Sequence, residues 1–266
     1  MDSRGSERVA IVAGASGAIG SATVRALIER RINVVLAALA DPILAELARE
    51  ARDGGVRALV VPTDITRRDQ IDVLVAKTLV EFGRIDILIN AAGIGSSPSI
   101  CDSSDGDLEK VLAVNLLGPA RLMHAVLPVM KAQGRGSIVN IGSLAGEAGV
   151  MGIYSGSKFG LRGLTDSVRR EVRSCGIDVT LIEPGFVRSP MNPAHGDNLP
   201  GPEIVGNAIV AALRRPKRKR IVPAFYRIPA FIVGAFPALA DAVFCDARIQ
   251  ERINRDARAE REITRS

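Results

Sequence analysis

The chain has 266 residues, of which 47% are hydrophobic, so it is long enough for one large α/β domain with a well-filled core. Its three cysteines are widely spaced, without a Cys-x-x-Cys pair or a histidine cluster. This argues against a disulfide framework or a zinc site and favours a reducing, cytoplasmic setting. The net charge of +6 lies almost entirely in residues 214–220, so a diffuse basic surface for nucleic acid is not expected. No long apolar segment that could act as a signal peptide precedes the first apolar run.

Apolar runs of strand length recur along the chain, with helical segments between them. They are rich in Val, Ile and Leu, which is typical of strands buried on both faces. The alternation predicts a single α/β domain built on a Rossmann-type doubly wound parallel sheet of about seven strands, with helices on both faces. The predicted strands are 8–14, 33–39, 57–63, 86–92, 137–143 and 178–184, a last strand starts the segment 221–245, and helical periodicity covers 66–82, 118–133 and 155–174.

The first predicted strand runs into the glycine-rich stretch GASGAIG at residues 14–20. Backbone N–H groups of such a turn, together with the N-terminus of a helix starting near Ala18, can meet a pyrophosphate. We expect Gly14 to make the tight turn, Ser16 to donate to phosphate and Gly20 to let the helix lie close on the sheet. The position after the first strand favours a dinucleotide site over a purely structural turn. The residues predicted to contact the cofactor here are Gly14, Ser16, Gly17, Ala18, Ile19 and Gly20.

The end of the second strand bears on which dinucleotide is bound. An acidic residue there would accept hydrogen bonds from the adenosine ribose and would repel a 2′-phosphate. The chain has Ala37, Ala38 and Leu39 at this place, and Asp41 follows slightly later. The sequence therefore favours NADP over NAD, although no arginine is obviously placed to clasp a 2′-phosphate.

The stretch IYSGSKFG at residues 153–160 places Tyr154 one helical turn before Lys158. On a helix the two side chains share a face, within reach of each other. An ammonium beside a phenol favours the phenolate and lowers a tyrosine pKa that is normally ~10. A tyrosine tuned in this way can donate and accept a proton near neutral pH.

Further motifs stand at or near the ends of predicted strands. They are NAAG at 90–93, Ser143 at the end of the fifth strand, and Pro184 with Gly185 after the sixth, while VNLLG at 114–118 places Asn115 inside a helical segment. Taken in order with the glycine-rich loop and the Tyr154–Lys158 pair, they make the chain resemble the short-chain dehydrogenase/reductase family. The resemblance runs from about residue 7 to 192 and more loosely to 223. It implies an NAD(P)-dependent oxidoreductase that interconverts a secondary alcohol and a ketone.

The resemblance also implies roles for individual residues. Tyr154 would exchange a proton with the substrate oxygen, Ser143 would hydrogen-bond that oxygen, and Lys158 would bind the nicotinamide ribose. Asn115 would hold a water that links Lys158 to solvent. Among the cofactor contacts, Asp64 would touch the adenine, Asn90 and Gly93 would flank the adenosine end, Val187 would meet the carboxamide, and Ile65, Ala91, Pro184 and Gly185 complete the predicted set.

Several positions depart from the family pattern without deleting a catalytic group. Ala13 precedes the first glycine where threonine is usual, Ala18 replaces the middle glycine, and Ala91 replaces a second asparagine. Ser189 stands where a threonine is usual, and the interval of 11 residues between Ser143 and Tyr154 is shorter than expected. These changes bear on cofactor affinity and choice more than on the chemistry.

Residues 1–223 are assigned to the catalytic and dinucleotide-binding unit, and residues 224–266 to a C-terminal segment of the same domain. Residues 221–245 hold four of the seven phenylalanines but are broken by prolines, so a spanning helix of ~20 residues is not expected. Three uses stay open: a lid over an apolar substrate, a subunit interface, or a segment lying in a membrane surface beside the basic run. Burial against protein is favoured, and a homo-oligomer is expected.

The aromatic C-terminal segment favours an apolar substrate, such as a lipid or steroid-like molecule. Two alternatives to this oxidoreductase of apolar alcohols and ketones stay open. One is a reductase of 3-oxoacyl thioesters, and the second is a non-catalytic nucleotide-sensing or scaffolding protein of the same fold. No metal is needed for the implied chemistry. His124 is expected on a helix surface or interface, and His195 in a loop that would cover the substrate, where a solvated position is favoured over a substrate contact.

Overall fold

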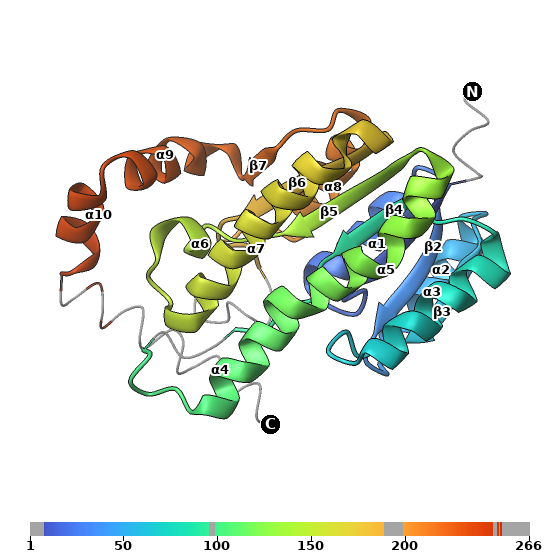
Figure 1. Cartoon of the computed structure of the whole chain (residues 1–266), viewed down its shortest axis with the longest axis horizontal. Helices are drawn as coiled ribbons and strands as arrows, with labels where there is room; N and C mark the ends of the chain where they lie inside the picture. Colours follow the sequence, from blue (N-terminus) through green and yellow to red (C-terminus); the bar gives the residue numbers. More distant parts are fainter. Residues whose placement is uncertain (1–7, 96–98, 189–198, 247–248, 250, 252–266) are drawn as a thin grey trace.

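The computed structural model of the protein describes residues 8–95, 99–188, 199–246, 249 and 251. Within them, seven parallel strands form one sheet in the order β3-β2-β1-β4-β5-β6-β7 (Figure 1). The expected doubly wound sheet is confirmed, and the strand order reverses between β1 and β4, where such folds bind their ligands. The strands are β1 (Val9–Ala13), β2 (Asn33–Ala38), β3 (Ala58–Pro62), β4 (Ile87–Asn90), β5 (Gly136–Ile141), β6 (Ile177–Pro184) and β7 (Lys219–Val222).

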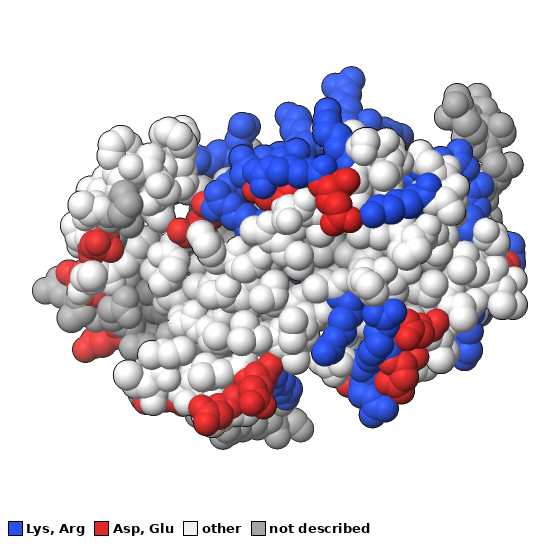
Figure 2. Space-filling model, in the orientation of Figure 1, with Lys and Arg blue, Asp and Glu red and all other residues white. Residues whose placement is uncertain are grey.

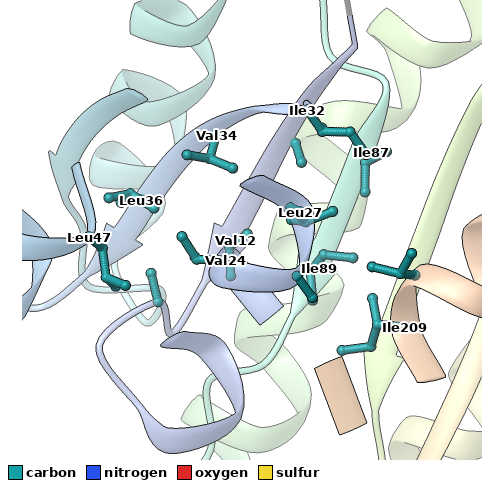
Figure 3. Close-up of a cluster of buried hydrophobic side chains, with 14 of the residues drawn as sticks. Val12, Val24, Leu27, Ile32, Val34, Leu36, Leu47, Ile87, Ile89 and Ile209 are labelled. Atoms are coloured by element: carbon teal, nitrogen blue, oxygen red, sulfur yellow. The ribbon is translucent and has the colours of Figure 1, made fainter. Parts of the chain in front are cut away.

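Helices cover both faces of the sheet. One face carries α1 (Ala18–Ile28), α2 (Ile43–Asp53) and α8 (Glu203–Arg214), and the other carries α3 (Arg68–Phe82), α5 (Gly118–Gln133) and α7 (Gly152–Val172). Two cores form because alternate residues of a strand point to opposite sides. In β1, Val12 joins the core under α1 and α2, whereas Ile11 joins the core under α3 and α5. Figure 3 shows the first of these cores, where Val12 of β1 and Leu27 of α1 belong to one apolar cluster.

Helix α5 continues from α4 (Asp105–Leu112) through the π-helical turn η2 (Ala113–Leu117). By length and composition alone, the stretch Asp105–Gln133 could cross a membrane. Of its most apolar part, however, 44% is buried inside the protein, and Leu122, Met123 and Val126 lie in the core under the sheet. Such burial is typical of a core helix of a globular protein. The π-helical turn η2 carries Asn115, one of the predicted site residues.

The C-terminal part of the described chain leaves the sheet after β7. The 3-10 turn η5 (Ala224–Tyr226) leads into α9 (Arg227–Ala235) and α10 (Pro237–Phe244), which extend away from the sheet (Figure 1). Helix α9 packs on the short helix α6 (Ala145–Ala148), and α10 packs on α9. We expected residues 224–245 to be buried against protein; this single chain does not bury them, and burial in a subunit contact stays a prediction. Their large apolar side chains are mostly exposed, because α9 and α10 pack mainly on α6, η5 and each other.

Candidate active site

The turn between β1 and α1 is the expected glycine-rich loop. Gly14 has a backbone φ of +84°, and its N–H and that of Ala15 donate to the carbonyl oxygen of Ala37. A Cβ at Gly14 would lie 2.5 Å from the backbone nitrogen of Ala92, and one at Gly20 would overlap the carbonyl oxygen of Gly14. The tight turn at Gly14 and the close packing at Gly20 are therefore both found, because neither position has room for a methyl group.

The N-terminus of α1 suits an anion. Gly17 precedes the helix, no side chain in the described part of the chain caps its first turn, and that turn holds no acidic residue. The first N–H groups keep hydrogen-bonding capacity, and the helix dipole adds a partial positive charge there. Ser16, Ala18 and Ile19 lie half-buried around this end of the helix, where each can approach a pyrophosphate.

Lys158 is a buried ammonium whose hydrogen bonds are incomplete. Only 5% of the residue is exposed, and its Nζ atom donates to the carbonyl oxygen of Ile141 over 3.0 Å. Burial lowers the pKa of this lysine to about 8. An ammonium has three N–H donors, and Ile141 provides the only acceptor for this one within the described residues. Two donors therefore stay available for a ligand.

Two glycines bring other backbone segments close to this lysine. A Cβ at Gly146 of α6 would lie 3.0 Å from the carbonyl carbon of Lys158, so this glycine lets α6 cover the lysine. A Cβ at Gly93 would lie 3.4 Å from both Lys158 Nζ and Asn115 Oδ1. Gly93 therefore lies beside the lysine, and its expected place at the adenosine end of a dinucleotide stays a prediction. Gly93 lies beside the lysine because Ile94, the next residue, is hydrogen-bonded through its backbone to Asn115.

Tyr154 is buried in the first turn of α7, four residues before Lys158. The helix begins at Gly152, earlier than expected, so the tyrosine is inside the helix. Lys158 Nζ lies 5.8 Å from the centre of the tyrosine ring, which confirms that the two side chains are neighbours. The ammonium charge and the positive end of the helix dipole both favour negative charge on the phenol oxygen.

Asn115 is fully buried in the π-helical turn η2 and joins two parts of the site. Its Oδ1 accepts from the N–H of Ile94, while its Nδ2 donates to the carbonyl oxygen of Ile94 and to Ser157 Oγ, over 2.9, 2.9 and 3.2 Å. Ser157 Oγ in turn donates to the carbonyl oxygen of Tyr154. Because both amide N–H groups are engaged, a water could be held here only through the second lone pair of Oδ1 or through the main chain.

Ser143 lies two residues beyond β5, at the start of the chain segment that covers Lys158. Its Oγ accepts a hydrogen bond from the backbone N–H of Ala145 over 3.1 Å. The hydroxyl proton has no acceptor among the described residues, so Ser143 can still donate to a ligand.

The polar residues expected near the adenine are engaged within the protein. Asn90 Nδ2 donates to Asn140 Oδ1 over 2.7 Å, which joins β4 to β5. Asp64 Oδ1 accepts from the N–H and the hydroxyl of Thr66, over 2.8 and 2.7 Å. Asp64 keeps its second carboxylate oxygen for a ligand, and the buried Oδ1 of Asn90 has no hydrogen-bond partner among the described residues. The side chain of Ile65 is buried, which leaves its backbone as the part that can face a ligand.

The loops after β4 and β6 lie beside the residues described above. Ala91 donates its N–H to the last residue of β1, next to the glycine-rich loop. The carbonyl oxygen of Pro184 accepts from the N–H of Leu144 over 3.1 Å, so the end of β6 lies beside Ser143. Gly185 donates to the last residue of β7 over 2.8 Å, and Val187 is buried.

The two histidines and Ser189 add little to the site. His124 is exposed on α5, at the surface position expected for it. Ser189 and His195 lie outside the described residues. Within the residues that are described, no group of three or more His, Cys, Asp or Glu side chains could hold a metal ion.

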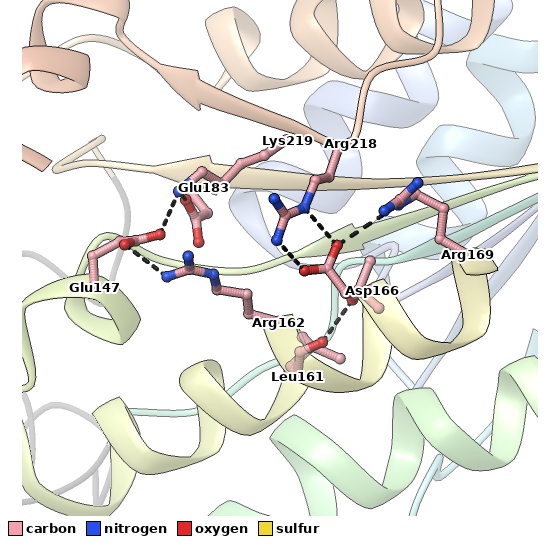
Figure 4. Close-up of polar contacts among 9 residues, drawn as sticks. Glu147, Leu161, Arg162, Asp166, Arg169, Glu183, Arg218 and Lys219 are labelled. Atoms are coloured by element: carbon pink, nitrogen blue, oxygen red, sulfur yellow. Dashed lines mark hydrogen bonds and ion pairs between the residues drawn. The ribbon is translucent and has the colours of Figure 1, made fainter. Parts of the chain in front are cut away.

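One cluster next to the site was missed by sequence reasoning. Glu147 of α6 forms ion pairs with Arg162 of α7 over 2.7 Å and with Lys219 of β7 over 2.5 Å (Figure 4). Lys219 also lies 3.3 Å from the buried carboxylate of Glu183 in β6. Burial, and then the nearby Glu147, raise the pKa of Glu183 to about 7. The four residues come from four elements, and no local motif indicates that they meet.

The family model for short chain dehydrogenases matches residues 8–199, which include the glycine-rich loop, Ser143 and the Tyr154–Lys158 pair. The chain belongs to the short-chain dehydrogenase family. This confirms the resemblance predicted from the motifs, and the protein is a short-chain dehydrogenase/reductase enzyme.

Relatives and solved structures agree with this membership. An uncharacterized oxidoreductase of Staphylococcus haemolyticus, SH0585, is 34% identical over 214 residues, 79% of this chain and 92% of that protein. The ketoacyl reductase HetN of a Nostoc species is 31% identical over 224 residues, 81% of this chain and 78% of that protein. A short-chain dehydrogenase/reductase from Burkholderia phymatum in complex with NAD has a TM-score of 0.81 at 24% identity, covering 87% of this chain and 94% of its own. The L-sorbose reductase from Gluconobacter frateurii, complexed with NADPH and L-sorbose, has a TM-score of 0.74 at 25% identity. The match covers 82% of this chain and 95% of the reductase chain.

Proposed function

We propose that this short-chain dehydrogenase interconverts a secondary alcohol and a ketone with an NAD(P) cofactor, and that Tyr154 is the general acid and base. The pairing of Tyr154 with Lys158, a buried ammonium that keeps two N–H donors, carries this proposal. Burying an ammonium with one acceptor costs stability. A nucleotide-sensing or scaffolding protein could use Lys158 to bind a ribose, but it would have no reason to keep Ser143, Tyr154, Lys158 and Asn115 together.

The residues present fit a nicotinamide dinucleotide. The uncapped N-terminus of α1 suits the pyrophosphate, and the two available donors of Lys158 suit the hydroxyls of a ribose. When bound, the nicotinamide ring supplies or accepts the hydride. The Burkholderia neighbour is in complex with NAD and the Gluconobacter neighbour with NADPH, which supports a cofactor of this class here.

The side chains around the substrate oxygen would manage its charge and its proton. In the direction of ketone reduction, the Tyr154 hydroxyl donates a proton to the oxygen as negative charge develops there. Ser143 donates a hydrogen bond to the same oxygen, using the hydroxyl proton that has no acceptor in the described structure. The charge on Lys158 stabilises the phenolate that Tyr154 becomes. Asn115, through Oδ1 or its main chain, would hold the water that returns a proton towards Lys158.

We infer a preference for NADP over NAD. Ala38 ends β2 without the carboxylate that would repel a 2′-phosphate. Asp41 lies slightly later, and its Oδ1 accepts a hydrogen bond from the N–H of Ile43 at the start of α2, over 3.0 Å. This bond holds one oxygen of Asp41 at the start of α2 and leaves the other free, so the proposed preference rests on Ala38.

The substrate is proposed to be an apolar secondary alcohol or ketone. A 3-oxoacyl thioester is the second candidate, and the similarity to the ketoacyl reductase HetN favours it. Both substrates present a carbonyl oxygen to Tyr154 and Ser143, so the catalytic residues do not separate them. The protein is further proposed to be cytoplasmic, consistent with the free thiols of Cys101, Cys175 and Cys245, and to form a homo-oligomer.

A substrate panel tests the proposal. The purified full chain is mixed with ketones, secondary alcohols and 3-oxoacyl thioesters, with NADPH or NADH for reduction and NADP or NAD for oxidation, and nicotinamide absorbance is followed. The matched control is Tyr154→Phe, which keeps the ring and removes the proton. Turnover by the wild type alone supports the proposal. Cofactor binding without turnover of any compound would instead favour a sensing or scaffolding protein.

A further inference from the structure

The two C-terminal helices carry an exposed apolar face. Its most exposed members, Phe225, Ile228 and Phe231, are 65%, 71% and 71% exposed and follow one another at intervals of three residues along η5 and α9. Such spacing places them on one side of the helical segment. A large exposed apolar surface of this kind marks an interaction site. The C-terminal apolar face consists of Phe225, Ile228, Phe231, Phe236, Leu239 and Val243.

A basic segment precedes this face in the chain. Arg214 at the end of α8, and Arg215 and Lys217 between α8 and β7, are exposed and make no ion pair with any described residue. By contrast, Arg218 and Lys219 are satisfied by carboxylates of the protein itself. Figure 2 shows Lys and Arg gathered along the upper edge of the molecule, next to the uncharged surface where Figure 1 places α9.

The lengths and charges of α9 and α10 suit a surface position on a bilayer. Helices of nine and eight residues are too short to span it. Within residues 224–245, only Arg227 and Asp241 are charged, so few charges would be desolvated. An apolar helical face flanked by cations is the arrangement by which helices lie in the headgroup region of anionic membranes.

We propose that this edge of the protein docks on an anionic lipid membrane. The C-terminal apolar face enters the boundary between headgroups and acyl chains, and Arg214, Arg215 and Lys217 lie among the headgroups. Charge favours this occupant over a second copy of the chain. Each copy carries a net charge of +6, and a two-fold contact would set this unpaired basic segment near its own equivalent. Anionic headgroups would neutralise it instead.

Vesicle sedimentation with the full chain tests the proposal. Large unilamellar vesicles of phosphatidylcholine alone are compared with vesicles that contain about 30% phosphatidylserine, at low salt and at about 0.5 M NaCl. We expect binding to the anionic vesicles, weaker binding to phosphatidylcholine and a loss of binding in salt. The double variants Ile228→Ser/Phe231→Ser and Arg215→Gln/Lys217→Gln should each weaken anionic-vesicle binding by about tenfold or more.

Matched controls use the same changes far from the proposed surface. Val73→Ser/Val80→Ser removes two exposed apolar side chains from α3, and Arg49→Gln/Lys77→Gln removes from α2 and α3 two exposed cations that form no ion pair with a described residue. Both controls should bind vesicles like the wild type, and circular dichroism confirms that every variant is folded. Absent binding, equal binding to both vesicle types, or equal losses in the controls would overturn the proposal. So would sedimentation velocity showing that Ile228→Ser/Phe231→Ser breaks an oligomer while vesicle binding is unchanged.

Discussion

The ammonium of Lys158, which belongs to α7, is held by the carbonyl oxygen of Ile141 at the end of β5, over 3.0 Å. The bond is made across two elements, and α6 covers the lysine from a third. The ammonium beside the Tyr154 ring is therefore in place before a ligand arrives. A site preorganised in this way does not have to order its lysine when substrate binds.

Tyr154→Phe should lower kcat by about 10²–10⁴-fold and leave the Kd for cofactor nearly unchanged. The phenylalanine ring keeps the packing in the first turn of α7, while the hydroxyl that exchanges the proton is lost. Steady-state kinetics and calorimetric titration of the cofactor measure the two quantities. Substantial residual turnover would remove Tyr154 from the mechanism.

Lys158→Met should change how stability depends on pH. Burial places the folded pKa of Lys158 at about 8, below its usual 10.5. Between these values the unfolded chain holds a proton that the folded protein has released, so wild-type unfolding free energy rises from about pH 8 to 10 relative to the variant. Urea unfolding of both proteins across this range measures the difference. A constant difference would show that the lysine is not desolvated.

Glu183→Gln should stabilise the protein at about pH 8 and give no such gain near pH 5. Burial and Glu147 raise the pKa of Glu183 from 4.5 to about 7, although Lys219 opposes the shift. The protonated carboxyl therefore contributes stability at low pH that is lost as pH rises through 7, and the amide never ionises. Thermal unfolding at both pH values measures the effect, with Glu109→Gln on exposed α4 as the control. A gain of equal size at both pH values would contradict the assignment.

Gly20→Ala should destabilise the apo protein by about 1–3 kcal/mol, because the added methyl group overlaps the carbonyl oxygen of Gly14. Gly17→Ala is the matched control, since a Cβ there would lie 3.4 Å from the same oxygen, close to ordinary contact. Its stability should stay near that of the wild type. Denaturant unfolding without cofactor separates the packing effect from any effect on binding, and equal losses in both variants would refute the explanation.

Ala38→Asp should reverse the cofactor preference proposed above. A carboxylate at the end of β2 repels a 2′-phosphate and accepts hydrogen bonds from an unphosphorylated ribose. Calorimetric titration measures the Kd of each cofactor. The Kd of NAD divided by the Kd of NADP should fall by tenfold or more, which is roughly 1.4 kcal/mol in favour of NAD. Ala38→Asn, which has nearly the same shape without the charge, should shift it less. An unchanged ratio in Ala38→Asp would place the ribose elsewhere.

The features of the site that depend on one chain segment could be predicted from the sequence. The spacing of Tyr154 and Lys158 fixes their adjacency once the segment is helical, and Gly14 and Gly20 are fixed by the geometry of one strand-to-helix turn. The parallel sheet could be predicted for the same reason, because each apolar strand and each helix between the strands has a pattern that lies within one short segment.

Features that depend on the order of the strands could not be predicted. Glu147 and Lys219 are 72 residues apart and meet because β7 lies beside β6 and α6 lies over their ends. The nearness of Gly93 to Lys158 was not predicted for a similar reason, since it depends on the bonds between Ile94 and Asn115. Apolar composition also fails to distinguish a core from an exposed contact surface, which is why the exposure of Phe231 was not foreseen.

Helix α6 has only four residues, yet it lies between two very different surroundings. On one side Gly146 touches the backbone of Lys158, and on the other α6 contacts α9, where the Cβ of a side chain at Gly234 would lie 4.0 Å from Glu147 Oε2. Helix α6 alone therefore separates the backbone of Lys158 from α9. A molecule bound to α9 on the side of α6 would therefore be separated from Lys158 by α6 alone.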